Sequence, residues 1–357
     1  MATRVRSHSK INLGLAIGPV RGDGFHELAT LYQTLALYDV VTVEARRTTT
    51  TRIALTTNDA RVPVDARNTA WKMVERALAR MGVAAEVAIH IEKELPVEGG
   101  MGAGSANAAA ALIGLERELG VALPEAGRLE VAAEVGSDVP LFLVGGAVVG
   151  LGRGELVWGM PDLPATACVV ALPGVGVSTP QAFRDWDQRQ VQGSRFEVRG
   201  GGGLTEKPQS DRLKQLSYAY ASAFGVAIPA EAASDTSGIV RGLGPEGASL
   251  KAGNTRNDLA ESNLLALVRT GIENDFEQVV FPQYPLLREI KHELMGRYSD
   301  SPALVAALSG SGSALFGLYR STAAASAAQQ RVQASGCKAI VTDTLPRGEY
   351  WRTMFAE

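Results

Sequence analysis

The chain has 357 residues, of which 46% are hydrophobic and 20% charged, a composition that predicts a globular protein of about two domains. No apolar run reaches the ~18 residues that a membrane helix requires, and the first residues contain no apolar signal core, so we expect a cytoplasmic protein without membrane contact. Two cysteines exclude a disulfide scaffold and a cysteine-rich zinc site. The net charge of −3, without a long basic run, argues against nucleic acid as a partner.

Short strands and three helices are predicted in the first part of the chain. Apolar residues alternate from Val5 to Ile17, which is typical of a strand, and the glycines at 22 and 24 indicate a turn after it. Asn68 is placed to cap a helix that Gly82 would close. We expect strands at 41–44, 53–55, 87–91 and 147–149, and helices at 69–81, 105–119 and 128–135.

The composition changes near residue 165, which predicts two domains, 1–165 and 166–357. The second begins with a buried-strand pattern at 167–172. A polar stretch with four consecutive glycines, 200–203, predicts a flexible surface insertion near 187–250. We expect helices at 211–224, 257–270 and 285–298, and strands at 314–319 and 339–343.

The strongest local pattern is the glycine-rich segment 96–108, which opens an apolar helix. Glycines let the backbone approach a ligand closely, and the helix start offers free N–H groups, so this segment predicts a phosphate site. No Gly-Lys-Ser/Thr follows, which excludes a Walker A loop. Asn107 stands where a dinucleotide fingerprint requires its third glycine. The alternative is a tight turn whose glycines serve packing alone.

Two further segments carry candidate catalytic groups. Asp138 lies between a predicted helix and an apolar run, where a partly desolvated carboxylate can act as a base; a helix-capping role is the alternative. Lys10 and Asn12 share the strand face opposite the apolar Ile11, which indicates either a functional or a solvated face. His26 is one of four histidines, and no His-Glu-x-x-His pattern occurs, which excludes a zincin.

Taken together, five motifs resemble the GHMP kinase superfamily, named after galactokinase, homoserine kinase, mevalonate kinase and phosphomevalonate kinase. Three of them are the glycine-rich segment, 136–140 and 309–313. The other two motifs resemble one branch of the superfamily, the 4-diphosphocytidyl-2-C-methyl-D-erythritol kinases. One motif consists of residues 10–13 with 21–28, and the other of residues 173–183 with 274–282. The resemblance covers roughly 1–185 and 255–345, with the motifs in the expected order.

The resemblance implies an α+β, two-domain GHMP kinase fold, with a ribosomal-protein-S5-like N-terminal and a ferredoxin-like C-terminal domain. It also implies transfer of the ATP γ-phosphoryl group to the substrate's 2-hydroxyl, with Lys10 and Asp138 catalytic. The implied substrate-binding residues are Asn12, Phe25, His26, Thr179 and Phe183. The implied ATP-binding residues are Asn68, Lys93, Pro96, Gly99, Gly100, Met101, Gly102, Ala103, Gly104, Ser105, Asn107, Gly310 and Gly312. Mg²⁺ is the implied metal, and Ser105 the candidate ligand.

The sequence departs from the family pattern at Glu98, Ala103 and Ala106 in the loop, and at Phe25, where a tyrosine is usual. Two alternatives stay open: another GHMP kinase, such as a homoserine or mevalonate kinase, and a non-catalytic nucleotide-binding relative. We expect small-molecule partners only, and a monomer or homodimer.

Overall fold

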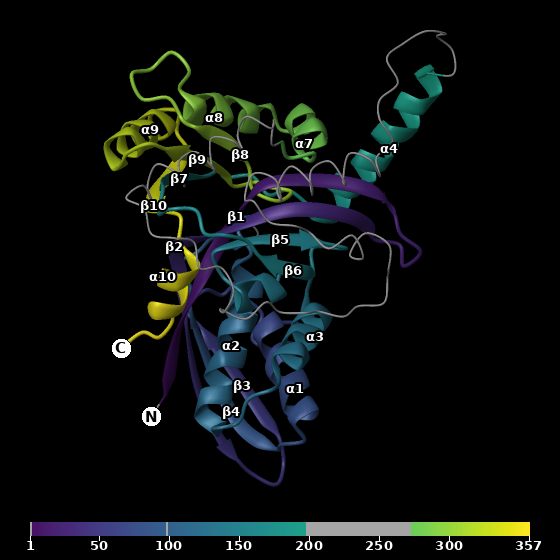
Figure 1. Ribbon diagram of the computed structural model, residues 1–357, viewed down its shortest axis with the longest axis vertical. Coiled ribbons are helices and arrows are strands. Elements are labelled where there is room, and N and C mark those ends of the chain that lie inside the picture. The colour runs from purple at the N-terminus through teal and green to yellow at the C-terminus, as the bar shows by residue number, and fades with distance from the viewer. Residues whose placement is uncertain (1, 98, 198–272) are drawn as a thin grey trace, which may run out of the picture.

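A computed structural model describes residues 2–97, 99–197 and 273–357, and two β-sheets organise that part of the chain (Figure 1). The strands are β1 (Thr3–Val20), β2 (His26–Arg47), β3 (Arg52–Thr57), β4 (Ala85–Glu92), β5 (Ala147–Leu151), β6 (Leu156–Gly159), β7 (Ala167–Leu172), β8 (Val305–Leu308), β9 (Leu315–Tyr319) and β10 (Lys338–Asp343). The helices are α1 (Thr69–Met81), α2 (Ala103–Leu119), α3 (Glu125–Val135), the 3-10 turn η1 (Pro140–Leu143), α4 (Thr179–Glu197), α7 (Glu277–Gln283), α8 (Pro285–Met295), α9 (Thr322–Ala334) and α10 (Arg347–Arg352).

The first sheet has the order β3-β4-β2-β5-β6, and β1 pairs with β2. All of its pairs are antiparallel except β3 with β4, which are parallel. The register places Lys10 opposite Thr34 and Asn12 opposite Tyr32. β1 confirms the strand predicted from the alternation. β2 is far longer than the predicted 41–44, because its residues 29–35 are buried on both faces and so do not alternate.

Capping residues set the bounds of α1 as predicted. The side chain of Asn68 accepts a hydrogen bond from the N–H of Ala70, and Gly82 closes the helix in the left-handed conformation. α2 begins at Ala103, two residues before the expected start.

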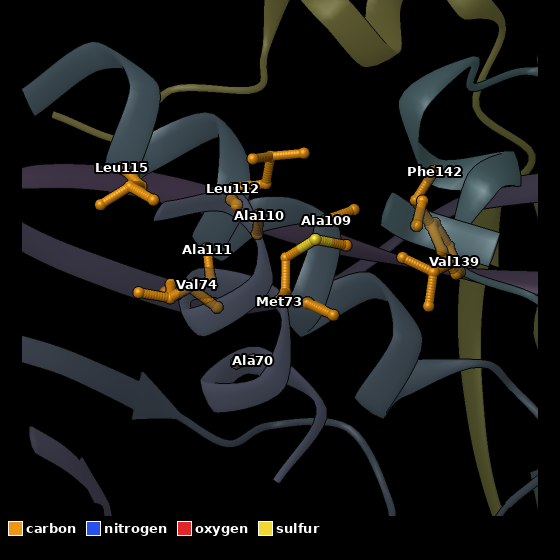
Figure 2. Packing of buried hydrophobic residues seen from close by; sticks show 14 of the residues in the cluster. Ala70, Met73, Val74, Ala109, Ala110, Ala111, Leu112, Leu115, Val139 and Phe142 are labelled. Carbon is orange, nitrogen blue, oxygen red and sulfur yellow. The ribbon is translucent and has the colours of Figure 1, made fainter. Parts of the chain in front are cut away.

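An alanine-rich core joins α1 and α2 to the first sheet. Ala70, Met73 and Val74 of α1 pack against the buried face of α2 (Figure 2). On the sheet side, a Cβ on Gly114 would lie only 2.7 Å from a methyl carbon of Val43. The small residues of α2 therefore let the helix approach both neighbours closely.

The second sheet has the antiparallel order β10-β7-β9-β8 and carries α7, α8 and α9 on one side. A third buried cluster includes Ile11 and Leu31 of the first sheet with Val170 and Phe316 of the second. The long strands β1 and β2 therefore lie between the helices of the first part and the second sheet (Figure 1).

One part of the predicted insertion is helical. The expected flexible segment near 187–250 is wrong over 187–197, because α4 continues to Glu197. This helix is mostly polar, so the sequence did not indicate it. Its narrow apolar face includes Ala182 and Trp186, which are four residues apart and buried. The predicted helices at 211–224 and 257–270 lie outside the described residues, and α8 ends at Met295 rather than at 298. None of the described helices is long and apolar enough to cross a membrane.

Candidate active site

Lys10 and Asn12 are buried side by side on the same face of β1. The Lys10 ammonium donates to Asn12 Oδ1 at 2.7 Å and lies 3.3 Å from Asp138 Oδ2. Asn12 in turn donates to the hydroxyl of Thr30 at 2.8 Å. With only 3% of the Lys10 side chain exposed, its charge acts in a largely water-free setting, where electrostatic interactions are strong.

Asp138 lies in the short connection between α3 and η1, and about a third of its side chain is exposed. Tyr32 donates a hydrogen bond to Asp138 Oδ1 at 3.0 Å, while Oδ2 faces Lys10. Burial and the neighbouring Asp138 charge raise the pKa of Tyr32 well above its ordinary value, so the phenol stays protonated as a donor. The carboxylate is thus oriented from two sides and remains reachable from solvent.

Tyr32 was not predicted from the sequence. Its contact depends on the β1–β2 register, in which Asn12 pairs with Tyr32, and no local motif reports that register.

The glycine-rich segment forms the start of α2. Gly100 and Gly102 adopt positive φ angles of 72° and 69°, which favour glycine. A Cβ on Gly102 would lie 2.9 Å from Phe142 and 3.1 Å from Lys10 Cε. Gly102 is the N-cap of this 17-residue helix and provides no side-chain cap, so N–H groups of the first turn are available to an anion. Glu98 lies outside the described residues.

A pocket of about 370 Å³ brings together the residues expected on the ATP side. Its lining includes all of the predicted positions before residue 108: Asn68, Lys93, Pro96, Gly99, Gly100, Met101, Gly102, Ala103, Gly104, Ser105 and Asn107. Two of these side chains, Asn107 and Lys93, already bind other residues of the protein, which limits their ability to contact ATP. Asn107 accepts a hydrogen bond from the Ser7 hydroxyl at 2.6 Å, and the Lys93 ammonium lies 2.6 Å from Asp39 Oδ2.

The Lys93–Asp39 pair is almost completely buried. Asp39 Oδ1 also accepts the backbone N–H groups of Glu94 and Leu95, so the pair holds the chain at the entrance to the glycine-rich segment. Any contact of Lys93 with ATP would therefore involve a cation that already has a buried partner.

Gly310 and Gly312 do not line this pocket but support it. The Ser309 hydroxyl donates to the Gly100 carbonyl oxygen at 3.0 Å, and a Cβ on Gly100 would overlap the Ser309 carbonyl oxygen. A Cβ on Gly310 would lie 3.6 Å from the Lys10 ammonium nitrogen. The turn 309–313, more than 200 residues away in sequence, thus completes the wall behind Lys10.

Most of the residues expected to bind the acceptor substrate lie where the β1–β2 hairpin meets α4. The His26 and Phe183 rings are stacked, with centroids 4.9 Å apart and an interplanar angle of 8°. Phe25 is half exposed, and the Thr179 hydroxyl lies 2.6 Å from that of Ser311. His26 Nδ1 lies 3.0 Å from the Gly18 carbonyl oxygen, and Nε2 lies 3.2 Å from Asp187 Oδ1, so both ring nitrogens face acceptors.

Asp187 was also missed from the sequence. Its position four residues after Phe183 would have indicated a shared helix face, had α4 been recognised as a helix.

Comparisons with known proteins agree with this geometry. The family model "GHMP kinases N terminal domain" matches residues 68–146, and "GHMP kinases C terminal" matches 256–338. A protein of Solibacter usitatus named 4-diphosphocytidyl-2-C-methyl-D-erythritol kinase is 33% identical over 88% of this chain and 81% of its own length. The chain belongs to the GHMP kinase family. Its predicted resemblance to these kinases is confirmed.

Other relatives extend the comparison. A protein of the same name from Rhodococcus jostii is 42% identical over 53% of this chain and 61% of its own, so that match spans less than two thirds of the relative. A crystal structure of 4-(cytidine 5'-diphospho)-2C-methyl-D-erythritol kinase is 25% identical, with a TM-score of 0.62, and the match covers 95% and 98% of the two chains. Homoserine kinase from Cytophaga hutchinsonii, 18% identical with a TM-score of 0.65 and covering 97% and 95%, shares the fold.

Proposed function

We propose that this GHMP kinase transfers the γ-phosphoryl group of ATP to the 2-hydroxyl of 4-diphosphocytidyl-2-C-methyl-D-erythritol. The products are the 2-phosphate and ADP. The observation that carries the proposal is the Lys10–Asp138 pair, 3.3 Å apart and directly behind the glycine-rich helix start, in a chain whose relatives carry that activity in their names.

In this mechanism Asp138 accepts the proton of the attacking hydroxyl. Its partial exposure leaves room for that hydroxyl, while Tyr32 and Lys10 fix the direction of the carboxylate. Lys10 also stabilises the negative charge that develops on the acceptor oxygen. Phosphoryl transfer requires mainly positioning and charge stabilisation, and this arrangement supplies both.

The N–H groups of 99–105 bind the phosphates of ATP in the pocket at the start of α2. The open helix end and its dipole favour an anion there. We assign Asn68 and Lys93, which line the same pocket, to its adenine side.

Mg²⁺ fits this site through one protein oxygen and the phosphates. Among the described residues, no group of three or more histidine, cysteine or acidic side chains is placed to hold a metal ion. Ser105 lines the pocket beside the segment of Asp138, since a Cβ on Gly136 would lie 4.0 Å from the Ser105 hydroxyl oxygen. Mg²⁺ commonly binds through a few protein oxygens and substrate phosphates, where it neutralises phosphate charge, and the Ser105 hydroxyl is its proposed ligand.

The cytosine end of the acceptor binds near Phe25, His26 and Phe183. The stack of His26 on Phe183 provides a flat aromatic wall. Because both His26 ring nitrogens already face acceptors, the backbone groups of His26 are the better placed to read the base edge. Asn12 and Thr179 complete the acceptor side.

We propose two domains, 1–165 and 166–357, each built around one of the two sheets. We assign the first domain to the ribosomal-protein-S5-like type and the second to the ferredoxin-like type. A cytoplasmic location and a monomeric or homodimeric state remain predictions of the sequence.

The test is an assay of ADP release from purified protein. With 4-diphosphocytidyl-2-C-methyl-D-erythritol, ATP and Mg²⁺ we expect turnover, and with Mg²⁺ chelated we expect none. Homoserine and mevalonate are the comparison acceptors. Turnover with either of them, and none with the cytidyl compound, would contradict the proposal.

A further inference from the structure

The tight turn between β5 and β6, residues 152–155, touches both ends of the proposed acceptor site. The Leu28 N–H donates to the Gly152 carbonyl oxygen at 2.6 Å, which ties the turn to the start of β2. A Cβ on Gly154, whose φ is 101°, would overlap the Tyr32 hydroxyl and lie 4.0 Å from Asp138 Oδ1. The turn therefore lies directly against the catalytic carboxylate.

Arg153 extends from this turn toward the proposed base-binding end. Its guanidinium carbon lies 4.9 Å from the centroid of the Phe25 ring, within the range of a cation–π contact. Glu155 accepts the Arg153 backbone N–H at 2.5 Å, and its other oxygen lies 3.5 Å from Arg153 Nε. Glu155 thus fixes the turn, and its ion pair with the guanidinium is long.

Two other cations near the proposed acceptor site, Lys10 and Arg21, are more tightly paired. Lys10 contacts Asp138 and Asn12, as described above. Arg21 lies 3.4 Å from Asp23 and 3.0 Å from Glu27. Within the described part of the chain, Arg153 makes no hydrogen bond through its two terminal nitrogens that would compete with an incoming anion. About 29% of its side chain is exposed, so it is accessible.

We infer that Arg153 binds the diphosphate of the acceptor and thereby selects a nucleoside diphosphate conjugate over an uncharged nucleoside. The inference rests on the proposed function, in which the base lies near Phe25 and the reacting hydroxyl near Asp138. The diphosphate joins these two parts of the substrate, and Arg153 stands on the turn that touches both. A planar guanidinium whose two terminal nitrogens make no hydrogen bond to the described residues suits bidentate contact with phosphate oxygens.

The experiment compares cytidine 5'-diphosphate with cytidine as ligands of Arg153→Gln and of the unaltered protein, by calorimetry. A non-hydrolysable ATP analogue at saturation keeps the ATP pocket occupied. We expect Arg153→Gln to weaken the diphosphate by about 10–100-fold and cytidine by less than about threefold, since a charged hydrogen-bond partner is lost only for the former. Arg153→Lys should restore part of the loss.

Arg46→Gln is the matched control, because Arg46 is an exposed arginine of β2 that is paired with Glu86. It should change neither affinity. An equal loss of both ligands in Arg153→Gln would overturn the inference, because Arg153 would then act only by supporting Phe25. Unchanged diphosphate binding would overturn it as well. If the unaltered protein binds neither ligand, the proposed function fails, and the inference fails with it.

With the full acceptor, Arg153→Gln should raise KM and leave kcat within about threefold, as expected when binding is lost equally in the ground and transition states. A fall in kcat at unchanged KM would instead place Arg153 in the chemical step and contradict the assignment.

Discussion

At the scale of single residues, the site depends on how two buried polar side chains, Lys10 and Tyr32, orient one partly exposed carboxylate, that of Asp138. Asp138 faces Lys10 through one oxygen and Tyr32 through the other, so its direction is fixed before a substrate arrives. Both partners are more than 100 residues away from Asp138 in the sequence. Lys10 and Asp138 were predicted because both fall in recognisable motifs, whereas Tyr32 depends on strand register and was not.

We expect Asp138→Asn to retain the fold and to lower kcat by ~10²–10⁴, the usual contribution of a positioned general base. Lys10→Ala should affect the same step, so the double variant should lose much less than the product of the two single losses. Steady-state kinetics of the three variants measure this, with melting temperatures as the control for folding. Losses that multiply would show that the two residues act independently.

A second residue-scale prediction concerns stability at acid pH. Burial of the His8 ring, against a smaller opposing effect of a backbone contact at Leu35, lowers its pKa to about 4. The folded state therefore keeps His8 neutral, whereas the unfolded chain protonates it near pH 6.5. Because the unfolded state binds more protons in this window, stability should fall as the pH drops from about 6.5 to 4, by on the order of 2–3 kcal/mol from this group.

Urea unfolding between pH 7 and 4 measures that loss. His8→Phe keeps a ring against Tyr38 and Tyr350 and removes the titrating group. It should flatten the pH dependence over this window. An unchanged slope in the variant would assign the acid sensitivity to other groups.

At the scale of elements, the two ends of α2 differ in how closely the neighbouring side chains approach the glycine there. Gly102 and Gly120 both adopt positive φ, 69° and 61°, at the start and the end of the helix. A Cβ on Gly102 would lie within 3.1 Å of Phe142 and Lys10, whereas a Cβ on Gly120 would have nothing within 4 Å. Replacing either glycine with alanine therefore strains the backbone, because both have positive φ. Only at Gly102, the end near Lys10, would the added methyl group also clash with neighbouring side chains.

We expect Gly102→Ala to lower kcat/KM for ATP by at least ~10-fold, because the alanine methyl displaces Lys10 or the loop. Gly120→Ala should cost about 1–2 kcal/mol of stability with kcat/KM unchanged. Kinetics and thermal unfolding of both variants separate the two effects. Equal activity in the two variants would show that the contact with Lys10 is unimportant.

How far the sequence predicted each element depended on local chemistry. α1 was predicted residue by residue, because Asn68 and Gly82 mark its ends with side-chain and backbone chemistry. The last part of α4, 187–197, was taken for the start of a loop, because its residues are mostly polar. The length of β2 was missed because burial on both faces removes the period of two.

At the scale of the whole molecule, the C-terminal segment that contains α10 packs against the core formed by the first sheet, α1 and α2. Arg347 donates to the carbonyl oxygens of Gly145, Ala147 and Met160, and Tyr350 is buried with its hydroxyl donating to the Phe142 carbonyl oxygen at 2.6 Å. α10 therefore lies beside η1, the turn that follows Asp138. Sequence alone placed this segment in the second domain and showed nothing of the contact, which joins residues about 200 positions apart.

We expect Tyr350→Ala to destabilise the protein by about 3–5 kcal/mol, as for other buried aromatic side chains replaced by alanine. Tyr350→Phe keeps the ring, and its loss of one hydrogen bond should cost about 1–2 kcal/mol. Chemical unfolding of both variants gives the two values. A small effect of the alanine variant would mean that α10 is not part of the cooperative unit that includes Phe142.

The contact between Gly100 and the turn at Ser309 has a consequence for any attempt to divide the protein. The loop that receives ATP is fitted against a carbonyl oxygen supplied from beyond residue 300, and Lys10 has that same turn as its wall. If the protein were cut between the sheets and expressed as two fragments, one would carry Lys10, Asp138 and the glycine-rich segment, and the other the turn that supports them. Phosphoryl transfer would then report reassembly of the fragments, as in a split-enzyme sensor whose signal arises only when both pieces meet.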